Sequence, residues 1–412
     1  MVAPAPLHQR IEFVVELARR LHEYGTAAPR LEAAISLVAR RLHLGCDVLS
    51  TPTSIVMSFA DDVHGQRSLA EITQVVRLSP GEVNLKRLCL VDEIADRVID
   101  GSLDLAEGAL RLRLIGDLPQ PALSKLAGVL AYGVASACVA AILLTGWAGV
   151  ATAGLIGLAT GATSMLAANR PNIAAAFEAI SALVATIVAT LVAVYVVPIE
   201  VRSVVIASLI ILLPGMSLTT AVRELSSQHL ISGTARMAGA MATLLKLAFG
   251  TAAAAHLCTL LGWVPAQMPA PAVPAWLEWV AVPVAALSFA ITFRSPLRHY
   301  PIVIGAVILG YLCTRIGGAY VSAPFGVFLG GLVLGAVSNV FARLFRRPGA
   351  LIREPGIILL VPGSVGFRSL SFVFERDVML GLDTGITLLT LLIALVAGLL
   401  FGDLLVPPRR KL

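Results

Sequence analysis

IILLPGMSLTTAVREL, residues 210–225, recurs in altered form as ILLVPGSVGFRSLSFV at residues 358–373. In each copy a Pro-Gly pair follows an apolar run that is too short to cross a bilayer. Proline removes an amide donor and glycine tolerates unusual backbone, so we expect a helix to break at each pair. Irregular backbone at membrane depth survives only where protein or a watery cavity satisfies it. Two such breaks in corresponding places predict a transport site.

The composition is that of a membrane protein. Of 412 residues, 57% are hydrophobic and 14% charged, and the mean hydropathy is +0.87. Residues 1–123 carry 13 basic and 16 acidic side chains, whereas the rest of the chain carries 18 basic and 9 acidic ones. We therefore expect a water-soluble head and a membrane body whose basic residues lie in short loops. The lipid bilayer is an expected partner, and nucleic acid is not.

The sequence shows no motif for a disulfide framework, a metal site, a nucleotide-binding loop or a nucleophile turn. The five cysteines are scattered without a C-x-x-C pair, and the histidines lack ligand spacing, so we expect no disulfide framework, metal site or cofactor. The chain contains no phosphate-binding loop of ATP-driven pumps and no G-x-S-x-G nucleophile turn. Because no secretory leader opens the sequence, we expect the head to stay in the cytoplasm.

Residues 1–122 read as a small α+β domain. The periodicity of apolar residues predicts helices at 7–24, 28–43, 82–100 and 103–115, and strands at 47–50, 54–60 and 71–78 with a hairpin turn at 61–65.

The rest of the chain reads as a mostly α membrane protein with ten spans. With about 20 apolar residues needed for each span, the segments fall at 124–145, 148–168, 175–197, 202–221, 234–261, 275–293, 300–316, 322–345, 355–372 and 384–406. One offset of 148 residues aligns the last five with the first five. Five spans is an odd number of crossings, which predicts two inverted repeats at 123–262 and 263–412.

The distribution of basic residues predicts the topology. With both termini inside, 13 lysines and arginines fall on the inner side, and only Arg202, Arg315, Arg368 and Arg376 fall on the outer side. Cytoplasmic loops collect such charges, which favours ten spans over nine or eleven.

At residues 21–32 the head reads L-H-E-Y-G-T-A-A-P-R-L-E, and TPTSIVMSF follows at 51–59. Together with a ten-span body and its two Pro-Gly breaks, this pattern resembles the threonine/serine exporter family over nearly the full chain. The resemblance implies a multi-pass secondary transporter of the cytoplasmic (inner) membrane. It would export L-threonine and L-serine as a proton-driven antiporter and would not be an enzyme. For Arg30 and Glu32, a gating head and a solvated helix start both remain open.

The two breaks predict the substrate site, because the new N-terminus of a broken helix favours an anionic group such as a carboxylate. The alternative is that both are packing kinks. Arg368 is a candidate partner for a carboxylate or simply an outer-loop charge. The candidate substrate-binding residues are Pro214, Gly215, Ser217, Thr219, Thr220, Pro362, Gly363, Ser364, Gly366 and Arg368.

Lys246 is the main candidate for proton coupling. It lies ten residues into a span that starts at Arg236, which places it ~15 Å deep. Ionisable groups at that depth usually face a cavity or a partner, although a snorkelling side chain or structural ion pair is the alternative. His256, Glu178 and Asp383 are further candidates, and charges at helix ends need no function.

Two other function classes remain: a membrane-anchored enzyme, and a sensor whose head reports ligand occupancy. The first would need a nucleophile or metal cluster in residues 1–123, and the sequence suggests none. Protons and a small amino acid are the expected ligands, and the sequence leaves the oligomeric state, a homo-oligomer included, open.

Overall fold

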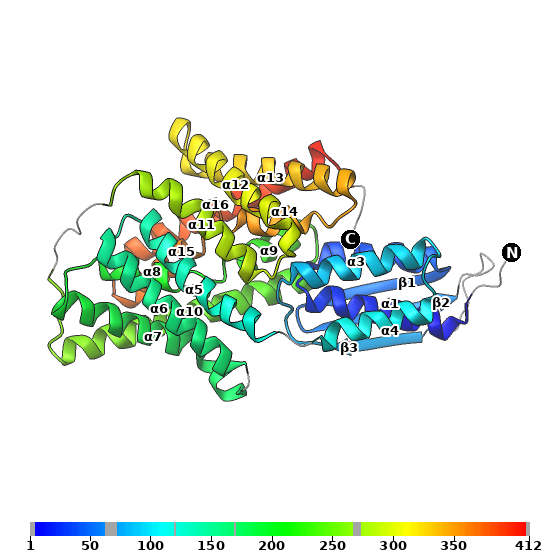
Figure 1. Cartoon of the computed structure of the whole chain (residues 1–412), viewed down its shortest axis with the longest axis horizontal. Coiled ribbons are helices and arrows are strands. Elements are labelled where there is room, and N and C mark those ends of the chain that lie inside the picture. Colours follow the sequence, from blue (N-terminus) through cyan, green and yellow to red (C-terminus); the bar gives the residue numbers. More distant parts are fainter. Residues whose placement is uncertain (1–4, 62–71, 119–120, 169, 267–272, 409–412) are drawn as a thin grey trace.

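The computed structural model describes residues 5–61, 72–118, 121–168, 170–266 and 273–408. Figure 1 shows two parts along the longest axis, a head that contains the strands and a larger helical body. The side of the body that faces the head is called the head side below, and the opposite side the far side.

The head packs four helices on a small sheet. Its elements are α1 (Leu7–Glu23), α2 (Ala28–Arg41), β1 (Leu44–Thr51), β2 (Ser54–Asp61), β3 (Ile72–Arg77), α3 (Leu85–Ile99) and α4 (Leu105–Asp117). The sheet is antiparallel in the order β1-β2-β3. Burial alternates along β2, so Ile55, Met57 and Phe59 point into the core that α1 and α2 cover.

These elements lie close to the predicted ones. The main difference is β1, which begins at Leu44 rather than Asp47 because residues 44–46 pair with residues 59–61 of β2. The predicted hairpin turn, beyond Asp61, lies outside the described residues.

The body consists of α5 (Ala122–Ile142), α6 (Gly146–Ala167), α7 (Pro171–Tyr195), α8 (Val201–Ser208), α9 (Gly215–Ser226), α10 (Leu230–Leu260), α11 (Trp276–Thr292), the 3-10 turn η1 (Leu297–His299), α12 (Tyr300–Tyr320), α13 (Ala323–Phe345), α14 (Ala350–Ile357), α15 (Gly363–Phe374) and α16 (Val378–Leu405). Among the described residues, seven of these helices are long and apolar enough to cross a membrane: α5, α6, α7, α10, α12 with η1, α13 and α16. The shorter helix α11 is also apolar. The chain is therefore a multi-pass membrane protein.

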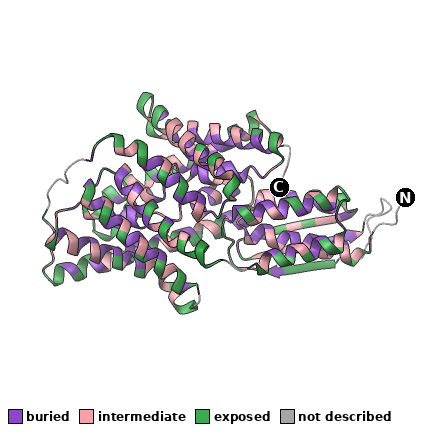
Figure 2. Ribbon diagram, viewed as in Figure 1, coloured by how far each residue is buried: buried purple, intermediate pink, exposed green. Residues whose placement is uncertain are grey.

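The outer surface of the body suits a lipid environment. Figure 2 shows exposed residues along the outer sides of its helices and buried residues between them. Large apolar side chains such as Leu260, Tyr320 and Leu389 are among those exposed. Such a surface would be costly in water and is ordinary against acyl chains.

The two predicted segments with Pro-Gly pairs are each a pair of short helices. α8 and α14 have eight residues each, and α9 and α15 have twelve each. The breaks have nearly the same backbone: φ and ψ are −78° and 38° at Pro214, and −82° and 39° at Pro362. α8 ends at Ser208 and α14 at Ile357, a few turn residues follow, and a new helix begins at each glycine. The proline before that glycine lacks the amide that a continuous helix would need.

The head is fastened to the body by backbone and side-chain contacts. The amides of Leu85 and Lys86, at the start of α3, donate to the carbonyls of Phe293 and Arg294 at 3.0 Å each. Arg347 also pairs with a head residue, Glu93, at 3.1 Å. The turns that follow α11 and α13 therefore lie on the head side.

Candidate functional site

The two helix breaks touch each other. A Cβ atom added to Gly363 would lie 3.1 Å from both the Cα and the nitrogen of Gly215. A Cβ added to Gly215 would lie 3.3 Å from the nitrogen of Gly363. Both glycines are buried. A Cβ atom on Gly215 would also lie only 2.3 Å from Cγ1 of Val361, so the facing break leaves little room for a side chain at either glycine. We call this contact, formed by Pro214-Gly215 and Pro362-Gly363, the paired breaks.

A cavity with two chambers lies between the paired breaks and the head, and we call it the head-side cavity. The inner chamber, of about 80 Å³, reaches Met216 and Ser217 in the first turn of α9. The outer chamber, of about 30 Å³, extends along the head. Since one water needs about 10–15 Å³ on this scale, the cavity has room for several waters or a small polar ligand. The residues that line both chambers are Gly25, Ala27, Val83, Arg223 and Glu354.

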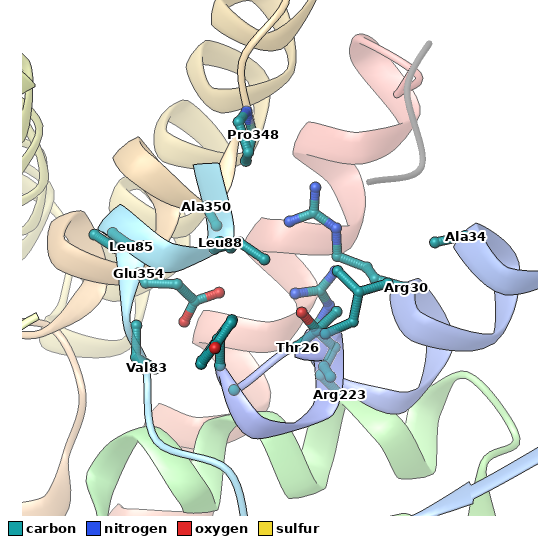
Figure 3. Close-up of a pocket in the computed structure, with 14 residues that line it drawn as sticks. Thr26, Arg30, Ala34, Val83, Leu85, Leu88, Arg223, Pro348, Ala350 and Glu354 are labelled. Atoms are coloured by element: carbon teal, nitrogen blue, oxygen red, sulfur yellow. The ribbon is translucent and has the colours of Figure 1, made fainter. Parts of the chain in front are cut away.

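Charged groups from three helices face the outer chamber: Arg30 of α2, Arg223 of α9 and Glu354 of α14. Figure 3 shows the Glu354 carboxylate on one side and the two guanidinium groups on the other. Within the described part of the chain, the side chains of Arg223 and Glu354 form no hydrogen bond or ion pair. Burial, reinforced by the positive charges of Arg353 and Arg223, lowers the pKa of Arg30 to about 10. The cavity therefore concentrates positive charge opposite one carboxylate.

Hydroxyl groups line the cavity as well. Ser217, Thr219 and Thr220 border the inner chamber, and Thr26 borders the outer one. The hydroxyls of Thr26 and Thr219 are buried and have no hydrogen-bond partner among the described residues. Buried polar groups are nearly always satisfied in native proteins, so these two indicate that a water or ligand belongs beside them.

A buried carboxylate joins the head to the body beside this cavity. Glu224, near the end of α9, is fully buried and accepts two hydrogen bonds from the Arg236 guanidinium, at 3.0 and 3.1 Å. It also accepts from the Ser232 hydroxyl at 2.9 Å and from the amide of Ala28 at 3.0 Å. Ala28 is the first residue of α2, whose N-terminal amides lack partners within the helix. Glu224 thus accepts a hydrogen bond from the N-terminus of α2, where no side chain of the helix's own N-cap does so.

The sequence motif of the head faces the body. Gly25 ends α1 with φ of 80°, a conformation that favours glycine, and lines both chambers. Glu32 accepts from the amide of Ser50 at 2.8 Å and contacts the ring nitrogen Nε2 of His229, at the start of α10, at 3.1 Å. The motif therefore forms part of the surface where head and body meet, rather than a solvated helix start.

A second polar cluster surrounds Arg353, the residue before Glu354 on α14, beside a cavity of about 160 Å³ that Arg30 and Arg223 also line. The buried Arg353 pairs with Asp403 of α16 at 2.5 Å and donates to Ser338 and Asn339 of α13. The amide of Asn339 also donates to Asp403, at 2.7 Å. Because every charge here has a partner, we regard this cluster as a structural tie between α13, α14 and α16.

The predicted substrate residues separate into three groups. Ser217, Thr219 and Thr220 line the head-side cavity, and the two Pro-Gly pairs form the paired breaks. Ser364 and Gly366 lie on α15, where a Cβ on Gly366 would meet Leu244 and Leu388 at 3.2 Å, so this turn packs against apolar helices. Arg368 is exposed and lies outside the cavity.

The predicted proton-coupling residues lie away from the cavity. α10 begins at Leu230, so Lys246 is near the middle of a 31-residue helix, and its Nζ lies 3.4 Å from Glu178 Oε2 of α7. Lys246 is 43% exposed, which makes this a pair on the surface of the body. His256 and Asp383 are exposed and contribute to neither chamber.

Sequence reasoning missed Arg223, Glu224 and Glu354. Arg223 was counted among the inner loop charges, although it follows Met216, Thr219 and Thr220 at the spacing of one helical face. That spacing could have identified it. Glu224 and Glu354 offered no comparable signal, because their partners come from the head and from distant helices.

Comparisons with known proteins identify the family of the chain. A family model for threonine/serine exporters matches residues 12–258, and a second, described as "Threonine/Serine exporter, ThrE", matches residues 278–405. Proteins called pheromone-regulated membrane protein 10 are similar over 99% of this chain: the one from Zygosaccharomyces rouxii is 26% identical, that from Eremothecium gossypii 26% and that from Saccharomyces cerevisiae 24%.

The chain spans about half the length of these relatives, 44%, 57% and 55% respectively. No solved structure matches the chain significantly. The two family models together cover most of the sequence on both sides of the linker between α10 and α11. The chain belongs to the threonine/serine exporter family.

Proposed function

We propose that this protein is a secondary transporter that exports small hydroxy amino acids, L-threonine and L-serine, across the cytoplasmic membrane. Membership of the family suggests a transporter rather than an enzyme. The observation that carries the proposal is the contact between Gly215 and Gly363, which joins two broken helices next to a polar cavity. A break that served only to kink a helix would not need a second break against it or hydroxyl groups beside it.

The proposal includes ten spans arranged as two inverted repeats of five. Seven long apolar helices, α11 and the two broken pairs supply the ten crossings. The equal lengths and backbone angles of the broken pairs support the repeat. The head would then lie in the cytoplasm with both termini, on the side where the basic loops gather.

Proton coupling is proposed through the Lys246–Glu178 pair. An ionisable pair on two body helices, α10 and α7, can take up or release a proton as the helices move apart. This role is separate from substrate binding, because the pair lies away from the head-side cavity.

The test is transport by the purified full chain in proteoliposomes. Vesicles loaded with unlabelled threonine or serine should accumulate the labelled amino acid by counterflow, and a pH gradient should drive net movement. Absence of counterflow for both amino acids, with the protein inserted and folded, would refute the substrate assignment. Counterflow that ignores the pH gradient would refute only the coupling.

A further inference from the structure

We infer that the head-side cavity binds an amino acid as a zwitterion between two body helices, with the carboxylate held by Arg223 and Arg30 and the ammonium group held by Glu354. The soluble head thereby supplies part of the binding site. This inference rests on the proposed function and adds to it the groups that recognise the substrate.

The first step of the argument is that opposite charges face each other without touching. Arg223 and Glu354 line both chambers, yet within the described residues they form no ion pair with each other or with another side chain. Both side chains are only partly exposed to water, and a partner of opposite charge would stabilise each of them. Figure 3 shows Glu354 on the other side of the cavity from the guanidinium groups, an arrangement that suits a ligand carrying both charges.

The second step is the distribution of charge within that space. Two guanidinium groups face the Glu354 carboxylate. The Arg353–Asp403 ion pair lies nearby, and the positive charges of Arg353 and Arg223 act on Arg30 more strongly than the carboxylates of Glu354 and Asp403. An anionic group would relieve this repulsion, and a planar guanidinium is well suited to a carboxylate. The ammonium group of the same molecule would then be drawn to Glu354.

The third step is the presence of unsatisfied hydroxyls at the edge of the same space. Thr219 is 2% exposed and its hydroxyl has no partner among the described residues, and neither has the buried hydroxyl of Thr26. A serine or threonine side chain can both donate and accept a hydrogen bond, which suits hydroxyl partners. A purely apolar side chain would leave these groups unsatisfied.

The head contributes directly because Arg30 and Thr26 belong to the loop and helix that follow α1. This segment is held against the body by the bond from Ala28 to Glu224 and by the contact between Glu32 and His229. Arg30 is thus positioned by the same contacts that dock the head.

The experiment measures binding to the purified full chain in detergent by calorimetry with four ligands: threonine, glycine, threoninol, which lacks the carboxylate, and 3-hydroxybutanoate, which lacks the ammonium group. Glu354→Gln should weaken threonine roughly tenfold or more and leave 3-hydroxybutanoate within about twofold. Arg223→Gln and Arg30→Gln should weaken threonine and 3-hydroxybutanoate by a similar factor and leave threoninol unchanged. Glu375→Gln and Arg202→Gln, which remove exposed charges outside the cavity, are the matched controls.

The outcomes separate this inference from the proposed function. If the wild-type chain binds threonine but Glu354→Gln and Arg223→Gln bind it as tightly, or lose all four ligands equally, the zwitterion site is refuted and the transport proposal stands. Binding of glycine but not of threonine, still sensitive to Glu354 and Arg223, supports the zwitterion site and refutes threonine as the substrate. A wild-type chain that binds none of these amino acids refutes both. Glu354→Asp and Arg223→Lys, which keep the charge, serve if the amide variants do not fold.

Discussion

α9 and α15 both begin at a Pro-Gly pair and have the same length of twelve residues. Their side chains differ in kind. The buried Thr219 of α9 corresponds, 148 residues later, to the buried Phe367 of α15, and Glu224 corresponds to Phe372. α9 lines a polar cavity and meets the head, whereas α15 packs on α10 and α16.

The difference shows that the position of each helix break and the polarity of the helix after it depend on different residues. The repeated Pro-Gly pair fixes where each helix breaks, because that depends on a missing amide and a missing side chain. What the new helix offers a ligand depends on which side chains of its next ten residues reach a cavity. α15 also carries serines and Arg368, but only α9 places hydroxyl groups and a charge in the head-side cavity. Of the two helices that follow the breaks, only α9 therefore contributes polar side chains to the candidate site.

The largest expected effect tests the charged end of α9. Glu224→Ala should lower the free energy of unfolding by roughly 3–5 kcal/mol, because it leaves the Arg236 guanidinium and the N-terminus of α2 without their acceptor. Thermal unfolding in detergent measures this. The control is Glu375→Ala, which removes an exposed carboxylate paired with Arg202 and should cost about 0–1 kcal/mol. Equal effects for the two variants would show that Glu224 does not hold the head to the body.

The second prediction concerns what α9 and α15 share. Gly215→Ala and Gly363→Ala should each destabilise the protein by about 1–3 kcal/mol and reduce transport, because the added methyl groups meet the facing break. Gly305→Ala is the matched control, since nothing lies within 4 Å of its Cβ position. Wild-type stability and transport in both break variants would mean that the paired breaks are loosely packed and do not act together.

The third prediction exploits the unsatisfied hydroxyl of α9. Thr219→Val should leave stability unchanged or raise it by about 1 kcal/mol, because a buried hydroxyl without a partner is removed. The same variant should bind threonine more weakly. Thr186→Val, whose hydroxyl donates to the Ala182 carbonyl at 2.9 Å, should instead lower stability by about 1 kcal/mol. A loss of stability in both variants would show that Thr219 has a structural partner rather than a ligand.

The smallest effect on stability is expected outside both helices. Lys246→Ala should change the free energy of unfolding by at most about 1 kcal/mol, because the pair with Glu178 is partly exposed. We predict that the variant inserts normally and loses proton-driven transport. Net transport that still follows the pH gradient would remove Lys246 from the coupling mechanism.

Much of the fold could be predicted from local signals. The periods of apolar residues located the helices and strands of the head, and the two Pro-Gly pairs located both breaks because their cause lies within two residues. The start of the helix that carries Lys246 was misplaced: it was put at Arg236, and α10 begins six residues earlier, at Leu230.

Only part of the candidate site could be predicted from the sequence. Ser217, Thr219 and Thr220 could be identified because they follow a break, and Arg223 could have been by its spacing. Ser364 and Gly366 were predicted by the same reasoning as Ser217, yet their helix packs against leucines, which depends on tertiary contacts. Arg30 and Glu354 line the same chamber although 324 residues separate them in the sequence. No local sequence pattern predicts that they lie together.

The most direct measurement compares the two helices within one experiment. In a cysteine-free background, Thr220→Cys and Ser364→Cys are each exposed to a membrane-impermeant maleimide from the head side, with and without threonine. We predict that the cysteine at position 220 reacts and that threonine protects it, whereas the cysteine at position 364 reacts slowly and is indifferent to threonine. A cysteine at position 220 that never reacts, or reacts at a rate that threonine does not change, would contradict a substrate site on the head side of the paired breaks.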